Sequence, residues 1–95
     1  ESPYLVNDAV FIKADNSFER VQYEDIYYVE ANGNMVTIFT KNRDYHIRKS
    51  MKEIEEILPS NDFLRVQKSY IVHLGQIESF NTKEITLKKG SVVQV

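Results

Sequence analysis

Hydrophobic and polar residues alternate with a period of two along most of this chain, and short polar turns interrupt the alternation. Alternate side chains share one face of a β-strand, so this pattern is typical of half-buried strands. In the segment Arg43–Lys49, for example, Tyr45 and Ile47 would face inward and His46 would face solvent. The predicted strands are Asp8–Lys13, Ser17–Gln22, Asp25–Ala31, Met35–Thr40, Arg43–Lys49, Phe63–Leu74 with an internal break, Gln76–Phe80, Glu84–Lys88 and Ser91–Val95.

One segment departs from this period and predicts a short helix over residues 51–58. Ser50 and Glu53 form a capping-box pattern, in which each side chain accepts a hydrogen bond from a free backbone N–H at the helix start. The apolar residues at positions 51, 54, 57 and 58 fall on one helical stripe, and Pro59 ends the helix. A helix of little over two turns is not stable alone, so we expect it to pack on a sheet.

The segment Asp25–Ala31 is predicted to be a central strand, because it carries apolar groups on both faces, as strands covered on both sides do. Asn32–Gly33 follows directly and is a strong hairpin signal, because a type I′ turn needs positive φ at both of its central positions. Alternation would place Ile26 and Tyr28 on one face of the strand and Tyr27, Val29 and Ala31 on the other.

In the stretch Phe63–Ile77, the even-numbered positions form one apolar strand face that a single lysine, Lys68, interrupts. Burying an unpaired ammonium group is costly, so a turn at Gln67–Lys68–Ser69 is the more stable arrangement. Each side chain of that turn can donate hydrogen bonds, and the whole stretch contains no carboxylate, so the turn suits an anionic partner. The other members of the apolar face are Leu64, Val66, Tyr70, Val72 and Leu74.

Many short strands and one helix indicate a mostly antiparallel β domain, either a sandwich or an open barrel. The 95 residues suffice for a single domain, 1–95, with one hydrophobic core. The absence of cysteine excludes a disulfide scaffold and is compatible with a reducing cytoplasm, where we expect the protein to reside. No apolar run reaches membrane-spanning length, so no membrane partner is expected. The chain starts at Glu1 rather than Met, so we expect it to be an excised domain of a longer protein.

Charge is segregated along the chain. The net charge of −2 argues against a simple basic nucleic-acid binder. Residues 13–30 contain two bases and five acids, a local balance of −3, whereas residues 41–52 contain five bases and one acid, a balance of +4. The second segment could attract an anion, although uneven sampling of ordinary solvated faces would produce the same pattern.

The residues that usually carry catalysis or bind metals are scarce. His46 lies on an exposed strand face and His73 in an apolar strand, and neither has a carboxylate pair at metal-ligand spacing. We therefore expect a surface residue and a hydrogen-bonded core residue, respectively. Ser69 and His73 are four residues apart on one strand, which separates their Cα atoms by roughly 13 Å and excludes a nucleophile–base pair. We expect no enzyme activity, no metal and no cofactor.

Three polar segments could together form an edge that binds anions: Asn32–Gly33–Asn34, Arg48–Lys49 and Gln67–Lys68–Ser69. Asn, Gln, Arg and Lys are the side chains that contact base edges or phosphates. Each segment alone is typical of a solvated loop. The combination is what suggests a nucleic-acid surface.

The run from Asp25 to Phe80 resembles the LytTR family of bacterial DNA-binding domains, also called the LytR/AlgR family. The matching features are a strand that ends in Tyr-Val-Glu, a polar turn, a Ser-Met-Lys-Glu-Ile helix closed by proline, and the block Phe-Leu-Arg-Val-x-x-Ser-Tyr-Ile-Val. The likeness extends from Asp8 to Val95. It implies an elongated fold of three small antiparallel sheets in series with one short helix, which binds double-stranded DNA through loops in successive major grooves.

The resemblance also implies a biological setting. Family members are usually output domains of two-component response regulators that control transcription, follow a receiver domain, and bind paired sites as dimers. The family continues beyond its last strand with another contacting segment, so we expect this chain to lack part of the DNA surface after Val95.

Position by position, the resemblance places Asn32 and Asn34 at the first groove and Gln67 and Lys68 at the second. Our hypothesis is that Lys68 and Asn34 contact base edges, that Gln67 and Asn32 assist, and that the pair Arg48–Lys49 holds phosphates. Family members often have His-Arg or His-Asn where this chain has Gln-Lys, so the preferred base is not implied.

Two other functions fit the residues. One is a small protein-interaction β module that would use an open sheet edge and exposed tyrosines such as Tyr4, Tyr27 and Tyr45. The other is single-stranded RNA or DNA binding, which would require aromatic side chains on one exposed face. Steep salt dependence would distinguish DNA binding from tyrosine-anchored protein binding.

Overall fold

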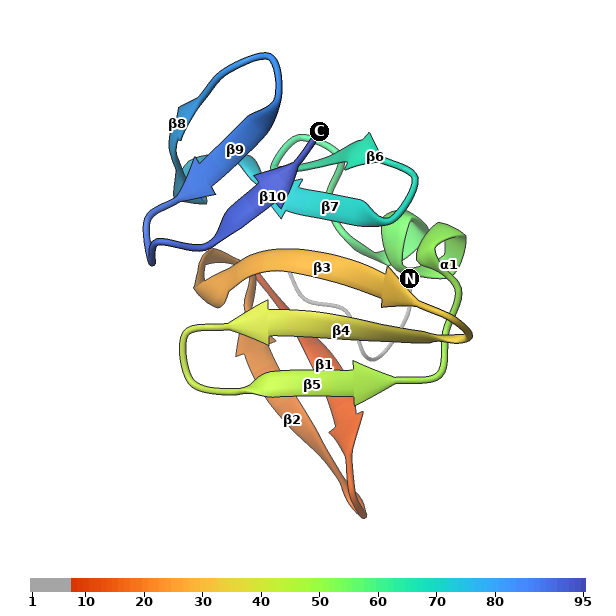
Figure 1. Cartoon of the computed structure of the whole chain (residues 1–95). Coiled ribbons are helices and arrows are strands. Elements are labelled where there is room, and N and C mark those ends of the chain that lie inside the picture. Colours follow the sequence, from red (N-terminus) through yellow and green to blue (C-terminus); the bar gives the residue numbers. More distant parts are fainter. Residues whose placement is uncertain (1–7) are drawn as a thin grey trace.

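A computed structural model describes residues 8–95 as three antiparallel sheets and one α-helix (Figure 1). The sheets have two strands in the order β1-β2, five in the order β5-β4-β3-β7-β6, and three in the order β10-β9-β8. The predicted mostly β, antiparallel architecture is confirmed. The strands are β1 Ala9–Ala14, β2 Ser17–Gln22, β3 Ile26–Asn32, β4 Met35–Thr40, β5 Asp44–Ile47, β6 Phe63–Gln67, β7 Tyr70–His73, β8 Ile77–Phe80, β9 Glu84–Leu87 and β10 Val92–Gln94, and the helix is α1 Met51–Ile57.

The five-stranded sheet separates two hydrophobic clusters. The larger cluster lies between one face of this sheet, the β1–β2 hairpin and α1, and it includes Ile12, Val29 and Ile54. The smaller cluster lies between the other face and the three-stranded sheet, around Val72 and Leu87. The three sheets therefore succeed one another along a molecule of 39 × 27 × 24 Å, with the central sheet covered on both faces.

Strand β3 is the central strand of this sheet, as its two apolar faces predicted, but the predicted division between the faces is wrong. A register irregularity between Ile26 and Tyr28 interrupts the alternation. As a result Ile26 joins Val29 in the larger cluster, whereas Tyr27 and Tyr28 both pack against the smaller one. A β-bulge inserts one extra residue and so moves a side chain to the other face.

The β3–β4 hairpin is confirmed, but its turn is not the predicted type I′. Asn32 pairs with Met35, so the two loop residues are Gly33 and Asn34. Gly33 has φ +67°, whereas Asn34 is not among the residues with positive φ. Glycine at the first central position with an ordinary second residue is the pattern of a type II′ loop, which suits the twist of a hairpin equally well.

The predicted break at Lys68 is confirmed. Strand β6 ends at Gln67, β7 begins at Tyr70, and the Lys68 side chain is exposed. The predicted apolar face is only partly correct: Val66, Tyr70 and Val72 belong to the smaller cluster, but the two outermost members do not. Those two residues, Leu64 and Leu74, are 52% and 41% exposed, because the three-stranded sheet does not cover the ends of this strand pair.

Helix α1 begins as predicted and ends one residue earlier than predicted. The Ser50 side chain accepts from the Glu53 amide at 3.1 Å, and Glu53 accepts from the Ser50 amide at 2.9 Å. Leu58 is the residue that caps the C-terminus, and its buried side chain packs with Met51 and Ile54 against the sheet. The capping box thus fixes where the chain turns from β5 into α1.

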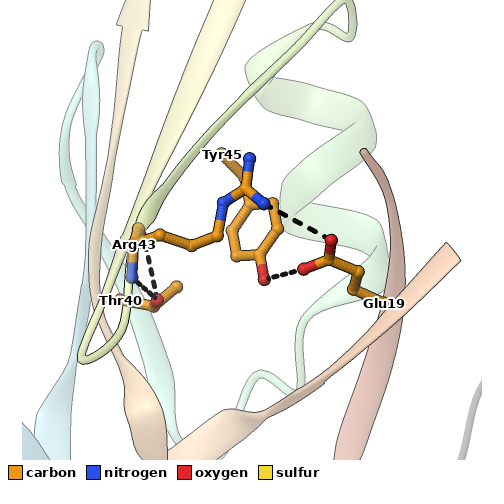
Figure 2. Close-up of polar contacts among 4 residues, drawn as sticks. All are labelled: Glu19, Thr40, Arg43 and Tyr45. Carbon is orange, nitrogen blue, oxygen red and sulfur yellow. Dashed lines mark hydrogen bonds and ion pairs between the residues drawn. The ribbon is translucent and has the colours of Figure 1, made fainter. Parts of the chain in front are cut away.

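A cluster of polar contacts fastens the β1–β2 hairpin to strand β5 (Figure 2). The Tyr45 hydroxyl donates to Glu19 at 2.7 Å, and Arg43 forms an ion pair with the same carboxylate at 3.3 Å while lying over the Tyr45 ring. The Thr40 hydroxyl donates to the Arg43 carbonyl at 2.6 Å. Burial raises the pKa of Tyr45, and the bond to Glu19 raises it further. Because the Arg43 guanidinium is engaged within this cluster, Arg43 stabilises the packing of the β1–β2 hairpin on strand β5.

Candidate nucleic-acid interface

The three polar segments that the sequence singled out lie at one end of the five-stranded sheet. Because neighbouring strands run antiparallel, the end of β3 at Asn32, the end of β5 at Ile47 and the end of β6 at Gln67 all point the same way. Figure 1 shows these ends together with α1 on the right of the molecule. The order β5-β4-β3-β7-β6 places the β3–β4 turn between the other two segments.

Two of these segments are joined directly by the backbone. The Ala31 amide donates to the Ser69 carbonyl at 2.9 Å, which ties the β3–β4 hairpin to the β6–β7 turn. A surface depression of about 280 Å³ lies at this junction, and Gly33, Lys49 and Lys68 are among its lining residues. The others are Ala31, Val36, Ser50, Met51, Arg65 and Ser69, so no carboxylate lines the depression.

The predicted cations at this end form no ion pair among the described residues 8–95. The three ion pairs there are Arg20–Asp8, Arg43–Glu19 and Arg65–Glu55, and none of them uses Arg48, Lys49 or Lys68. All three of these side chains are exposed. Lys49 does lie near the Glu53 carboxylate, which it helps to keep ionised by lowering its pKa, but Arg48 and Lys68 form none of these ion pairs and remain exposed to solvent.

The predicted residues differ in how they are placed. Asn32 and Asn34 are exposed on either side of Gly33 at the hairpin tip. Lys49 lines the depression and also the side that faces the β1–β2 hairpin, whereas Arg48 lies only on the latter side.

Gln67 reaches this end of the sheet with its backbone, but its side chain is engaged elsewhere. The Gln67 amide nitrogen donates to the Gln94 carbonyl at 2.9 Å, which fastens β6 to β10 of the three-stranded sheet. An amide has two N–H groups and an oxygen, so one bond leaves further capacity for hydrogen bonding. The predicted base contact by Gln67 would have to use that remaining capacity.

Arg65 is a functional candidate that the sequence analysis missed. Its guanidinium donates to the Lys68 carbonyl at 2.7 Å and forms an ion pair with Glu55 of α1 at 3.2 Å. Arg65 thereby holds the β6–β7 turn against the helix and lines the depression itself. The available signal was a cation three residues before Lys68, a spacing that lets a long side chain reach the carbonyl of the following turn.

The two histidines and the described tyrosines have structural surroundings. The His73 ring lies within 3.0 Å of the Ile26 carbonyl and is buried, as predicted, and His46 is exposed and bonded to Thr37. Tyr45, proposed above as an exposed anchor, is only 7% exposed, so that part of the interaction-module hypothesis is wrong. Tyr27 is half-buried beneath Lys89, and Tyr4 lies outside the described residues.

Within residues 8–95, His, Asp and Glu side chains form no group of three or more that could hold a metal ion. In the same part of the chain, the single short α-helix cannot span a bilayer, and no other helix is long or apolar enough to do so.

Comparison with known proteins gives a consistent result. The sequence profile of the family described as "LytTr DNA-binding domain" matches residues 16–95. The transcriptional regulatory protein NatR of Bacillus subtilis is 29% identical over 76 residues, covering 80% of this chain and 33% of NatR. The sensory transduction protein LytT of Bacillus cereus is 33% identical over 86 residues, covering 85% of this chain and 35% of that protein. The chain thus spans about a third of the length of these relatives.

A solved structure shares the fold. It is described as the LytTr DNA-binding domain of a putative methyl-accepting/DNA response regulator from Bacillus cereus, and it superposes with a TM-score of 0.79 at 21% sequence identity. The superposition covers 95% of this chain and 87% of that one.

Proposed function

The chain belongs to the LytTR family of DNA-binding domains, and on that premise we propose that it binds double-stranded DNA sequence-specifically through loops that enter the major groove. One observation carries the proposal: the β3–β4 turn, the Arg48–Lys49 connection and the β6–β7 turn meet at one end of the central sheet. Their cations have no carboxylate partners among the described ion pairs. Such an edge attracts the phosphate backbone, while the tips of its turns can reach base edges.

The individual roles follow from the placement of each side chain. Lys68 and Asn34, at the tips of the two turns, contact base edges, and Asn32 assists. Arg48 and Lys49 lie where the chain leaves β5 and hold phosphates on either side of that connection. Gln67 assists through the part of its amide that does not bind the Gln94 carbonyl.

The acidic net charge does not oppose this proposal, because most of the acidic segment lies away from this edge, and Glu30, which lies near it, accepts a hydrogen bond from the Tyr70 hydroxyl. Two of the acids in the N-terminal half, Asp8 and Glu19, are paired with Arg20 of β2 and with Arg43, which directly precedes β5. Fields of exposed charges are screened over about 10 Å at 0.1 M salt. A local positive edge therefore determines the approach of DNA more than the net charge does.

We further propose that this domain is the output half of a longer cytoplasmic response regulator that follows a receiver domain and binds paired sites as a dimer. The names of the relatives support a regulatory role, and the chain spans only about a third of their length. Sequencing the full open reading frame tests the first part. A membrane or enzyme domain in place of the receiver would contradict it.

A salt series on a duplex selected from a random library tests DNA binding. We expect the logarithm of the association constant to fall linearly with the logarithm of salt concentration, with a slope of about −0.9 per phosphate contact. Removing one cation by Arg48→Gln should reduce the magnitude of the slope by about one and weaken selected and scrambled duplexes alike. A flat salt dependence would favour the protein-interaction module and refute the proposal.

A further inference from the structure

A second concave site lies beside the proposed DNA edge, between the β1–β2 hairpin, strand β5 and helix α1. Its volume is about 390 Å³, which falls within the range of about 300–1,000 Å³ that is usual for small-molecule sites. The β1–β2 hairpin is distant in the sequence from β5 and α1, so the cavity depends on the tertiary fold. Its apolar floor is mostly aliphatic, with two phenylalanines, and is formed by Val10, Phe11, Ile12, Phe18, Ile38, Ile47, Ile54, Ile57 and Leu58.

The rim of this groove is cationic. Lys13, Arg48 and Lys49 contribute three positive charges, and Asp15 is the one carboxylate among the lining residues. All four of these side chains are exposed, and none belongs to the ion pairs of the described residues. A mostly aliphatic floor under an unbalanced positive rim is complementary to a molecule with an apolar body and an anionic head.

We propose that this groove binds a small anionic amphiphile, a carboxylate attached to an alkyl or comparably apolar body. The apolar body would lie on the floor, and the carboxylate would bind Lys13 and Arg48 at the rim. The cavity corresponds to about thirteen water volumes of ~30 Å³ each, which accommodates roughly a dozen non-hydrogen atoms. A stable protein partner needs about 800 Å² of contact on each side, far more surface than a cavity of this size offers.

The groove shares residues with the DNA edge, and this gives it a regulatory consequence that rests on the proposed function. Arg48 and Lys49 line the groove, Lys49 also lines the depression between the two turns, and both are assigned to phosphates above. A carboxylate at the rim would neutralise charge that DNA otherwise uses. Bound amphiphile and bound DNA therefore compete, and each lowers the affinity of the other by the same factor.

Calorimetric titration of the 95-residue chain with decanoate, below its micelle concentration, tests the site without DNA. We expect saturable one-to-one binding, and weaker binding of the neutral analogue decanol. Lys13→Glu reverses a rim charge that is not assigned to DNA, and it should weaken decanoate binding at least about threefold. The matched control is Lys83→Glu, which changes the net charge identically on an exposed residue outside the groove, and it should leave decanoate binding unchanged.

A second pair of variants tests the floor. Ile57→Glu and Ile57→Lys remove the same half-buried side chain from the end of α1 and differ only in the sign of the new charge. Decanoate should bind the lysine variant at least about tenfold more tightly than the glutamate variant, since reversing a charge combines a lost attraction with a repulsion. Should either variant prove unfolded by thermal melting, the Lys13→Glu comparison decides alone.

Several outcomes would overturn the site. Absence of decanoate binding, equal binding of decanol, or equal effects of Lys13→Glu and Lys83→Glu would each do so. A monomer–dimer equilibrium that Lys13→Glu abolishes in sedimentation, without decanoate binding, would make the groove an interface between copies of this chain. A titration of the selected duplex in the presence of decanoate then tests the competition: at one decanoate concentration, the duplex Kd should rise for the wild type and rise less for Lys13→Glu. An unchanged Kd overturns the competition, whereas failure to bind any duplex overturns the proposed function and leaves the calorimetric result standing.

Discussion

Replacing Arg65 by glutamine should destabilise the domain and also weaken DNA binding, because Arg65 holds the β6–β7 turn. The guanidinium donates to the Lys68 carbonyl at 2.7 Å and pairs with Glu55 at 3.2 Å. A hydrogen bond from a charged group contributes about 1.5–3 kcal/mol, and partial exposure favours the lower end of that range. The Arg65 and Glu55 side chains are 30% and 49% exposed, so their ion pair adds only about 0.2–1 kcal/mol.

The hydrogen bond and the ion pair together predict that Arg65→Gln lowers the free energy of unfolding by roughly 1.5–2.5 kcal/mol. For a domain of this size, that loss lowers Tm by about 6–20 °C. Glu55→Gln is the matched control, because it removes the ion pair and leaves the bond to the Lys68 carbonyl. It should cost no more than about 1 kcal/mol. Thermal unfolding followed by circular dichroism measures both variants under the same conditions.

The functional part of this prediction concerns the turn itself. Loosening the turn by about 1 kcal/mol should raise the Kd for a selected duplex roughly fivefold. Arg65→Lys keeps the positive charge but not the fork that reaches two acceptors, so it should lose affinity while keeping the salt slope of the wild type. Equal Tm values for Arg65→Gln and Glu55→Gln, or an unchanged duplex Kd for Arg65→Gln, would refute the assigned role.

Three further predictions concern the elements that position this surface. Ser50→Ala removes the helix cap and should lower the free energy of unfolding, measured by urea titration, by about 1 kcal/mol. An unchanged free energy of unfolding would refute the capping role. Tyr45→Phe keeps the ring and removes the bond to Glu19. The pKa of Tyr45 in the folded state is raised above the ordinary value of 10.0. The stabilisation from its hydroxyl is therefore present below pH 10.0 and is lost as the pH rises through the folded-state pKa. The variant should therefore lose less stability than the wild type in alkaline urea titrations, and parallel pH profiles would contradict this. Gly33→Ala places a Cβ on a residue with φ +67° and should lower the free energy of unfolding by about 1 kcal/mol. An unchanged midpoint of urea unfolding would contradict the turn geometry.

The features that could be predicted from the sequence are those set by local chemistry. The break before Tyr70 followed from the cost of burying the Lys68 ammonium group, and the start of α1 followed from the pairing of Ser50 with Glu53. Both features depend on residues within three or four positions of each other. The common position of the polar segments at one end of the sheet also depends on the pairing of β3 with β7, which is a long-range contact.

The features that could not be predicted depend on distant partners. The register irregularity between Ile26 and Tyr28 places both Ile26 and Tyr27 on the face opposite to the predicted one, and no alternation rule locates such an insertion. Leu64 is exposed because the three-stranded sheet does not extend over it, which strand pattern alone cannot reveal. Gln67 binds the carbonyl of Gln94, a residue 27 positions away, so its side chain could not be placed before the tertiary structure was known.

The central claim is that one end of the five-stranded sheet contacts DNA. Amide chemical-shift mapping of the labelled chain during titration with the selected duplex tests it most directly. We expect the largest shifts at residues 31–35, 48–50 and 65–70, with little change in the β1–β2 turn at Asp15 or in the β8–β9 loop near Asn81. Largest shifts in those two loops, with residues 31–35 and 65–70 unaffected, would contradict it.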